Sequence, residues 1–278
     1  MNKIIINSLP KSGTNLVARI LELGILDDSK ISFAASTSVG RHQIFKQCLR
    51  NFPRSGSNVP IGLQLDAAVS SKWLESKCSQ VKNQSFLTGH APFSHALSTI
   101  LKTNDIKMIL VVRHPLSVLL SWLHYIDKTA LGNNHPNHHL KMLSMSARMT
   151  ALIYGGYANR FFLNPFDEVL HRVQKWSEDE NVMIVKFENI IGADGGGTEK
   201  AYINTCEKMF SWIFGENNQK IPKYHDVYGK SHTFYKGKSL DFSNPLLRMP
   251  CIEDLKSTQN YIDFCAKYGY LASGSKSK

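Results

Sequence analysis

The stretch KIIINSLPKSGTNLVARILELG, residues 3–24, decides the fold. Residues 3–8 are rich in β-branched side chains and stop at a turn that contains Pro, Ser and Gly, which is typical of a buried strand. Apolar residues then recur at helical spacing from Leu16 to Leu23, and Gly24 ends the pattern. A strand, a glycine-containing loop and a helix in this order form the opening half of a βαβ unit.

The rest of the chain continues this alternation. Further strands are predicted at residues 85–88, 107–112 and 182–187. Helical patterns occupy residues 115–126, 140–161, 166–178, 199–214 and 253–268. Strands that alternate with helices predict an α/β fold, with a central parallel sheet flanked by helices on both faces. The stretches without a clear pattern, residues 31–59 and 217–250, are expected to be rich in loops.

Length and composition describe an ordinary globular protein. The 278 residues, 42% of them hydrophobic and 20% charged, contain no long Pro/Gly/Ser tract, so a single domain over residues 1–278 is predicted.

No window reaches the roughly 18 consecutive apolar residues of a membrane span. The N-terminus has no apolar run long enough for a secretory signal. The five scattered cysteines indicate reduced thiols. A cytoplasmic location is therefore expected.

The net charge of +11 favours anionic partners, although a basic surface that serves only solubility is an equal alternative. The sequence has no block of five or six like charges and no RNP-type aromatic motif, so nucleic acid is not an expected partner. No feature of the sequence indicates an oligomeric state.

The loop at residues 9–15 (LPKSGTN) is the first candidate site. Backbone N–H groups at a strand-to-helix turn and the positive end of the helix dipole form a cradle for an anion. Lys11 adds a positive charge, and the hydroxyls of Ser12 and Thr14 add hydrogen-bond donors. The alternative is a plain turn followed by an N-cap, but the strand-loop-helix context favours the cradle. The order K-S-G-T differs from a Walker A loop, whose lysine directly precedes the hydroxyl that binds Mg²⁺.

Residues 9–15 resemble the 5′-phosphosulfate loop of sulfotransferases that use 3′-phosphoadenosine-5′-phosphosulfate (PAPS), usually P-K-S-G-T-T-W. Residues 88–92 (TGHAP) are similar to the T-H-x-P segment that carries the catalytic histidine of this family, with one extra glycine. The VRHP segment, residues 112–115, with a serine eight residues after its arginine, resembles the motif that binds the 3′-phosphate.

Further matches follow in the order of the family. Residues 186–190 (KFENI) resemble the Y-E-D-L strand end, and residues 233–238 (TFYKGK) with Asp241-Phe242 resemble T-F-R-K-G-K…D-W. The KYGY segment at residues 267–270 is similar to the closing K-L-G-Y. The resemblance therefore spans nearly the whole chain and implies a P-loop-like three-layer sandwich.

The resemblance implies a function and a set of site residues. The chain would transfer a sulfuryl group from PAPS to a hydroxyl or amine of a small-molecule or glycan acceptor, releasing adenosine 3′,5′-bisphosphate without a metal. Lys11 would stabilise the leaving group and His90 would act as general base. The implied nucleotide-binding residues are Lys11, Ser12, Gly13, Thr14, Asn15, Arg113, Ser121, Tyr235, Lys236 and Gly237.

Some of these residues have structural alternatives. His90 could be a hydrogen-bonded histidine at the end of a strand, Arg113 could form a salt bridge at a helix start, and Ser121 could pack between helices.

The sequence also departs from the usual motifs. Asn15-Leu16 replaces Thr-Trp, Tyr235 replaces an arginine that contacts the 3′-phosphate, and Phe242 replaces a tryptophan.

Two alternative functions remain. One is a P-loop kinase acting on a small molecule, which would need Mg²⁺ and a Walker-type Lys-Ser/Thr pair. The other is a non-catalytic nucleotide- or anion-binding protein of the same fold.

The cluster HPNHH, residues 135–139, could suggest a metal site. Its Pro and Asn and the lack of a Cys or carboxylate among the histidines favour a solvated loop instead.

Overall fold

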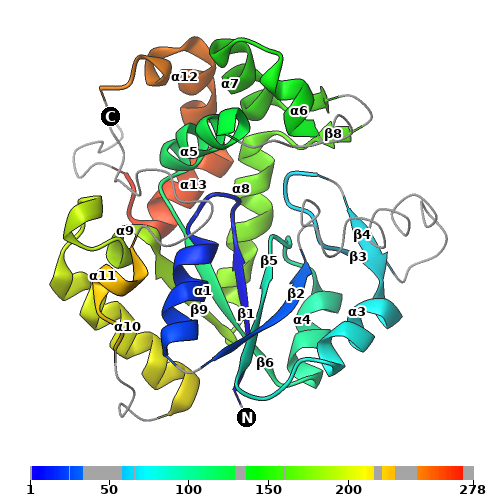
Figure 1. Ribbon diagram of the computed structural model, residues 1–278. Helices are drawn as coiled ribbons and strands as arrows, with labels where there is room; N and C mark the ends of the chain where they lie inside the picture. Colours follow the sequence, from blue (N-terminus) through cyan, green and yellow to red (C-terminus); the bar gives the residue numbers. More distant parts are fainter. Residues whose placement is uncertain are drawn as a thin grey trace.

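The computed structural model describes residues 2–24, 26–33, 58–65, 67–128, 136–158, 161–215, 221–228 and 243–271. At its centre lies a five-stranded sheet with the order β2-β5-β1-β6-β9 (Figure 1). The strands are β1 (Lys3–Ser8), β2 (Asp27–Phe33), β5 (Ser85–Gly89), β6 (Ile106–Val112) and β9 (Val182–Lys186). All neighbouring pairs in this sheet are parallel. The predicted parallel sheet is confirmed.

Helices cover both faces of the sheet. Successive residues of β1 point to opposite sides, so Ile4 and Ile6 pack in one apolar cluster and Ile5 packs in the other. The first cluster contains side chains of α1 (Thr14–Leu23), α9 (Phe187–Ile190), α10 (Glu199–Phe214) and α11 (Tyr224–Val227). The second contains side chains of α3 (Ser71–Ser79), α4 (His95–Thr103), α8 (Phe166–Gln174) and α13 (Gln259–Tyr268), among others. The result is the expected three-layer arrangement.

A smaller group of elements lies above the carboxyl ends of the strands in Figure 1. Its helices are α5 (Pro115–Lys128), α6 (Pro136–Lys141), α7 (Met145–Tyr154) and α12 (Pro250–Ser257). The antiparallel pair of β7 (Gly156–Ala158) with β8 (Phe161–Leu163) accompanies them. A second antiparallel pair, β3 (Asn58–Pro60) with β4 (Ala68–Ser70), lies beside α3. Short 3-10 turns at Lys175–Glu178, Ala193–Gly195 and Pro245–Arg248 complete the described elements. None of the described helices is long and apolar enough to cross a bilayer.

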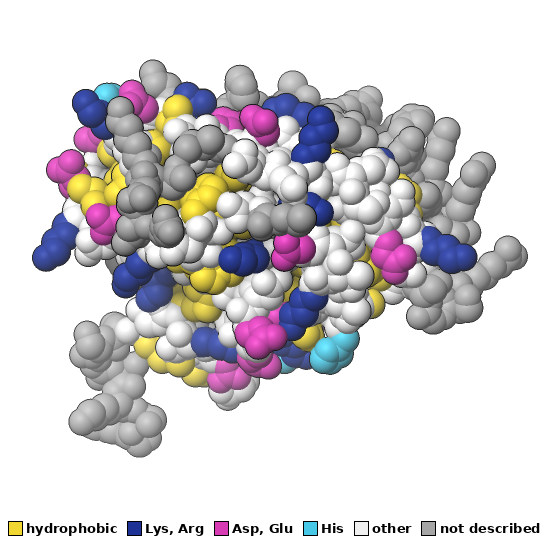
Figure 2. Space-filling view, turned by 90° about the horizontal axis from the view of Figure 1, so that it is seen from below, with side chains coloured by type: hydrophobic (Ala, Val, Ile, Leu, Met, Phe, Trp, Pro, Cys, Tyr) yellow, Lys and Arg dark blue, Asp and Glu magenta, His cyan; other side chains and the backbone are white. Residues whose placement is uncertain are grey.

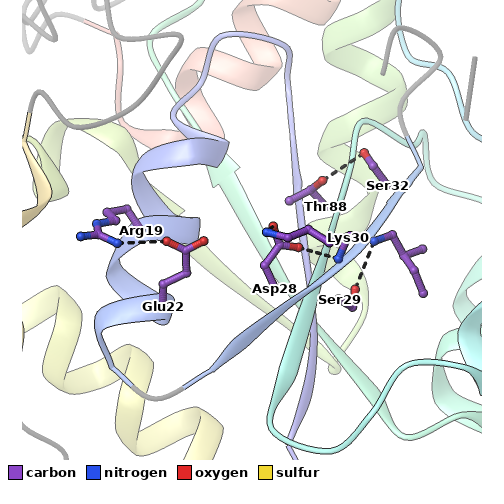
Figure 3. A network of polar contacts seen from close by, with 8 residues as sticks. Arg19, Glu22, Asp28, Ser29, Lys30, Ser32 and Thr88 are labelled. Atoms are coloured by element: carbon purple, nitrogen blue, oxygen red, sulfur yellow. Dashed lines mark hydrogen bonds and ion pairs between the residues drawn. The ribbon is translucent and has the colours of Figure 1, made fainter. Parts of the chain in front are cut away.

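Strand β2 was not predicted from the sequence, because its DDSKISF segment is largely polar. It lies at the edge of the sheet, and its pairing with β5 is irregular between Asp28 and Ser32. Lys30, with φ of 58°, lies within this irregularity. Figure 3 shows how polar contacts hold the edge: the Thr88 hydroxyl donates to Ser32 Oγ at 3.0 Å, and the Asp28 carboxylate accepts from Lys30. A half-exposed edge strand needs no apolar run.

Several boundaries predicted from the sequence were wrong. The helix predicted at residues 140–161 is divided into the end of α6, helix α7 and strand β7, because Gly155 and Gly156 adopt positive φ values of 72° and 111° and end α7. The helix at 253–268 is divided at Thr258, whose extended backbone caps α13. The last residue of the strand at 182–187, Phe187, begins α9 instead.

The loop-rich stretches also contain regular structure. Residues 31–33 complete β2, residues 58–59 begin β3, and the described parts of 217–250 include α11 and the 3-10 turn at Pro245–Arg248. The loop predicted for residues 135–139 was wrong for residues 136–139, because α6 begins at Pro136. Proline is favoured at the first position of a helix, where its missing N–H is not needed.

The loops that follow β1, β5, β6 and β9 meet at the carboxyl ends of the strands, which point upward in Figure 1. Parallel sheets bind their ligands at this end. Figure 2 looks onto the molecule from below, where Lys and Arg side chains lie scattered among Asp and Glu. The functional site is therefore expected at the upper end.

Candidate active site

The loop between β1 and α1 has an unusual backbone. Lys11 adopts a positive φ of 69°, and Gly13, the N-cap residue of α1, has a φ of 105°. The Gly13 carbonyl accepts hydrogen bonds from the amides of Leu16 and Val17, at 2.9 and 3.1 Å. A Cβ at position 13 would lie only 2.6 Å from the Phe187 ring, so the position needs glycine for space as well as for conformation. The loop is tightly folded onto the end of β9.

Ser12, in the middle of this loop, is fully buried, and its hydroxyl has no hydrogen-bond partner among the described residues. A buried polar group without a partner is costly, and native proteins rarely keep one without a reason. Ser12 directly precedes Gly13, the N-cap of α1, and the N-terminus of a helix favours negative charge. An anion that accepted from Ser12 would satisfy it, so the loop fits a phosphate or sulfate group.

Lys11 supplies the positive charge of the loop. Its ammonium lies over the ring of Tyr125 from α5, with Nζ 4.1 Å from the ring centroid. Burial, and then repulsion by Arg113, lowers the pKa of Lys11 to about 8. Lys11 is thus mostly protonated at neutral pH, although its charge is poorly solvated.

His90 follows β5 directly and is held against the end of β1. Its Nδ1 lies 2.8 Å from the Ser8 carbonyl oxygen and 3.2 Å from Ser8 Oγ. A carbonyl oxygen only accepts hydrogen bonds, so Nδ1 carries the proton and Nε2 keeps a free lone pair. Burial lowers the pKa of His90, the Ser8 carbonyl opposes that shift, and Lys11 adds to it. The imidazole is therefore neutral near pH 7, as a general base must be.

Ser8 joins His90 to the loop. Its hydroxyl lies 2.5 Å from Thr14 Oγ1, at the start of α1. A chain of polar contacts thus runs from Thr14 through Ser8 to His90. The last residue of β1 is in contact with both the anion loop and the candidate base.

Asn7 fixes the backbone around His90. The fully buried Asn7 side chain donates to the Ala91 carbonyl at 2.9 Å and accepts from the Ala91 amide at 2.8 Å. Trp176 Nε1 donates to the same carbonyl at 3.0 Å. Gly89, the extra residue of the TGHAP segment, remains in the sheet and pairs with Asn7. The side-chain amide of Asn7 therefore binds the backbone of the segment that follows β5, beyond the last paired residue of the strand.

Arg113 ends β6 and contacts the same loop. Only 8% of the residue is exposed. Its Nη1 donates to the Lys11 carbonyl at 3.0 Å, and its guanidinium lies 4.0 Å from the centre of the Phe187 ring. Burial lowers the pKa of Arg113 to about 10, whereas Glu188 and Tyr270 act in the opposite direction. Arg113 therefore stays charged at neutral pH.

Glu188, in the short helix α9, closes this side of the site. One carboxylate oxygen accepts from the His114 amide at 3.0 Å, and the other accepts from the Tyr270 hydroxyl at 2.8 Å. The His114 and Tyr270 rings meet edge to face at 5.3 Å. Burial, followed by repulsion from Arg113, lowers the pKa of His114 to about 4, so His114 is neutral. Through Glu188, Tyr270, which follows α13, is therefore linked to the segments that follow β6 and β9.

The structure brings together the loop residues 11–14, His90 and Arg113 around the end of β1. Asn15 lies exposed in the first turn of α1, and Ser121 is partly exposed on α5. Tyr235, Lys236 and Gly237 lie outside the described residues. Among the described residues, no group of three or more His, Cys, Asp or Glu could hold a metal ion, and His135 lies outside them.

Sequence reasoning missed some residues of this site. Asn7 and Tyr125 carry no motif, but a buried asparagine at the end of a β-branched strand is itself a signal, because it must satisfy its amide. Phe187 and Glu188 lie within the KFENI segment, which was compared with the family without a role for each side chain.

Comparison with known proteins gives one strong match. The model of the sulfotransferase domain family matches residues 1–194. No curated protein matches the chain.

Solved structures match the fold more weakly. Mouse sulfotransferase SULT7A1 complexed with PAP is 15% identical with a TM-score of 0.45, over 81% of this chain and 61% of that one. This chain thus spans 61% of the length of the mouse protein. Retinol dehydratase in complex with androsterone and inactive cofactor PAP is 14% identical with a TM-score of 0.43, over 96% of this chain and 79% of that one.

Proposed function

This chain belongs to the sulfotransferase domain family, and on that premise we propose that it transfers a sulfuryl group from PAPS to a hydroxyl or amine of an acceptor. The observation that carries the proposal is the position of Ser8. It contacts Thr14 of the anion loop and fixes the tautomer of His90 that leaves Nε2 available as a base, while burial keeps the imidazole neutral. Binding of an anion and removal of a proton can therefore occur at adjacent groups.

The loop residues would hold the 5′-phosphosulfate. The buried hydroxyl of Ser12 and the N-terminus of α1 would donate to its oxygens, and Lys11 would provide the charge. Arg113, charged and packed on Phe187, would bind the 3′-phosphate together with Ser121. We assign supporting contacts to Asn15, Tyr235, Lys236 and Gly237 on the family resemblance alone.

The proposed chemistry is an in-line displacement at sulfur. His90 Nε2 accepts the acceptor's proton as the acceptor oxygen forms its bond to sulfur. The bond between sulfur and the bridging oxygen breaks, and that oxygen keeps the electron pair. Lys11 stabilises the negative charge that develops there, and adenosine 3′,5′-bisphosphate leaves. Charge stabilisation and positioning suffice for such a loose transition state, so we propose that the reaction needs no metal.

We propose a small-molecule or glycan acceptor. The net charge of +11 favours an acidic one. The four described cysteines are all buried and free, in agreement with a reducing compartment such as the cytoplasm.

The test combines binding with turnover. In the presence of EDTA, adenosine 3′,5′-bisphosphate should raise the melting temperature clearly more than AMP or ATP, because a ligand at one hundred times Kd stabilises the native state by about 2.7 kcal/mol. Equal shifts with AMP would contradict the assignment of the 3′-phosphate site. A strict requirement for Mg²⁺ and ATP would favour the kinase.

Turnover separates an enzyme from a binding protein. With ³⁵S-labelled PAPS and panels of phenols, alcohols, amines and acidic glycans, at least one acceptor should become labelled as the bisphosphate is released. Tight bisphosphate binding without labelling of any acceptor would indicate a non-catalytic nucleotide-binding protein.

A further inference from the structure

Lys11 has an unusual environment for a charged side chain. Among the described residues, no carboxylate lies within salt-bridge distance of its ammonium, since none of their ion pairs includes it. The nearby ionisable groups either repel it or are neutral. Arg113 repels the ammonium, and His90 is a neutral imidazole. The feature that attracts the ammonium in the described structure is the ring of Tyr125, 4.1 Å from Nζ.

Tyr125 is well placed for this contact because α5 is firmly packed. The helix starts at Pro115, directly after Arg113 and His114, and buries Leu116, Leu119, Leu123 and Ile126 in the apolar core. The ring of Tyr125 itself packs against that core while presenting a face to Lys11. A rigid helix that begins beside the nucleotide site therefore brings an aromatic face to the loop after β1.

We propose that Tyr125 is the positioning residue of Lys11: its ring face holds the protonated ammonium beside the anion loop before an anion binds. A ring face attracts a cation through its quadrupole, and the attraction grows when the cation is desolvated. The inference rests on the proposed function only for the nature of the anion. The contact between the two side chains stands independently of it.

The contact has two consequences for Lys11. First, it favours the charged amine, and so opposes the burial that lowers the pKa of Lys11 to about 8. Second, it restricts a long, flexible side chain to few rotamers before the donor arrives, which reduces the entropy lost on binding. Both effects would strengthen anion binding. If the ring instead kept Lys11 away from the anion, removing the ring would tighten binding.

The direct test measures the ionisation of Lys11 in the nucleotide-free protein. Acetic anhydride acetylates only neutral amines, so the rate of Lys11 acetylation against pH, followed by peptide mass spectrometry, gives the midpoint of its titration. Lys72, exposed on α3, serves as the internal reference for reagent activity. The accessibility of the Lys11 amine to the reagent changes the maximal rate of acetylation but not the midpoint of the titration. The midpoint is therefore the quantity to compare.

The variants are Tyr125→Leu, Tyr125→Phe and Tyr125→Trp. Loss of the aromatic face in Tyr125→Leu should move the midpoint of Lys11 acetylation to lower pH by about 0.3–1.5 units, from the usual strength of a cation–π contact. Tyr125→Phe, which keeps the face, should match the wild type. Tyr125→Trp, with the strongest face, should move the midpoint to higher pH, and it keeps the test decisive even if Tyr125→Leu does not fold.

A second measurement uses adenosine 3′,5′-bisphosphate at pH 7. Tyr125→Leu should bind it less tightly than the wild type, and Tyr125→Phe should bind it equally well. An unchanged acetylation midpoint across all three variants, or tighter binding by Tyr125→Leu, would overturn the proposal. A wild type that binds no bisphosphate would contradict the proposed function, while the acetylation midpoints would still decide the role of Tyr125.

Discussion

Two regions of the site differ in how their charged groups are held. The loop end consists of residues 8–14 with His90, and the arginine end consists of Arg113, Phe187, Glu188 and Tyr270. At the loop end, Lys11 has a pKa lowered to about 8, His90 is neutral and Ser12 Oγ has no partner among the described residues. At the arginine end, the guanidinium is stacked and hydrogen-bonded, and both oxygens of Glu188 accept hydrogen bonds.

The difference separates two tasks. Groups that move protons or meet developing charge must be able to change their ionisation or their partners near neutral pH, as the groups of the loop end can. A group that only anchors a phosphate works best as a permanent charge in a fixed geometry, and a packed guanidinium provides this. The loop end is thus suited to chemistry and the arginine end to binding.

The largest expected effect is at the loop end. Replacement of His90 by Ala should lower turnover by about 10²–10⁴-fold, the usual contribution of a general base. Affinity for adenosine 3′,5′-bisphosphate should barely change, because the base faces the acceptor. Steady-state kinetics with PAPS and titration with the bisphosphate measure the two quantities.

A matched control for this variant is His95→Ala, since His95 is exposed at the start of α4. Its turnover should equal that of the wild type. If His95→Ala lost activity and His90→Ala kept it, the assignment of the base would be wrong.

The arginine end should show the opposite pattern. Arg113→Ala should weaken bisphosphate binding by roughly 1.5–3 kcal/mol, the range for a hydrogen bond to a charged group. Arg113→Lys should recover only part of this, because an ammonium neither stacks on Phe187 nor forms a planar fork. Calorimetric titration gives the affinities, and Arg19→Ala, on the exposed side of α1, is the control. Unchanged affinity together with a large loss of stability would point to a purely structural arginine.

The two ends meet at Gly13, so a change there tests whether they are independent. Gly13→Ala places a Cβ at 2.6 Å from the Phe187 ring at a φ of 105°, and Phe187 in turn stacks on Arg113. We expect a loss of about 1–3 kcal/mol in the free energy of unfolding, from backbone strain and the clash. Denaturant titration measures it.

A second substitution divides this loss. Phe187→Leu in the Gly13→Ala background should relieve the clash and recover part of the stability, but not the part due to backbone strain. Gly13→Ala should also lower bisphosphate affinity, because a displaced Phe187 ring no longer stacks on Arg113. The affinity should stay low in the double variant, because leucine offers Arg113 no ring to stack on. Full recovery of both quantities would show that the two ends work separately.

The sequence predicted the central sheet well, because β1 and β6 contain apolar runs buried between two layers of helices, and β5 has a buried Phe86-Leu87 pair before its closing glycine. It failed at β2, where a polar edge strand needs no apolar pattern, and within residues 140–161, where two glycines interrupt a helical pattern. Apolar periodicity reports burial, and these segments depend on edge position and backbone conformation instead.

The candidate site shows the same division. Lys11, His90 and Arg113 were named because local motifs contain them. Tyr125 and Asn7 could not be assigned a role, because their contacts join residues that are distant in the chain: Tyr125 meets Lys11, and Asn7 meets Ala91. Such pairs appear only once the register of β1 against β5 and the path of α5 are known.

The smallest expected effect, a pH dependence, tests whether the loop end titrates and the arginine end does not. Lys11 binds an anion best when protonated, and its pKa in the free protein is about 8. Affinity for adenosine 3′,5′-bisphosphate should therefore fall about twofold between pH 7 and 8 and then by up to about tenfold per pH unit, until the pKa of the bound state is reached. Arg113, with a pKa of about 10, stays charged through most of this range.

Two variants separate the groups. In Lys11→Gln the affinity should be lower at pH 7 and independent of pH up to about 9. Arg113→Ala should keep the wild-type pH dependence at reduced affinity. A fall above pH 8 that persisted in Lys11→Gln would assign the titration to another group and remove the distinction between the two ends.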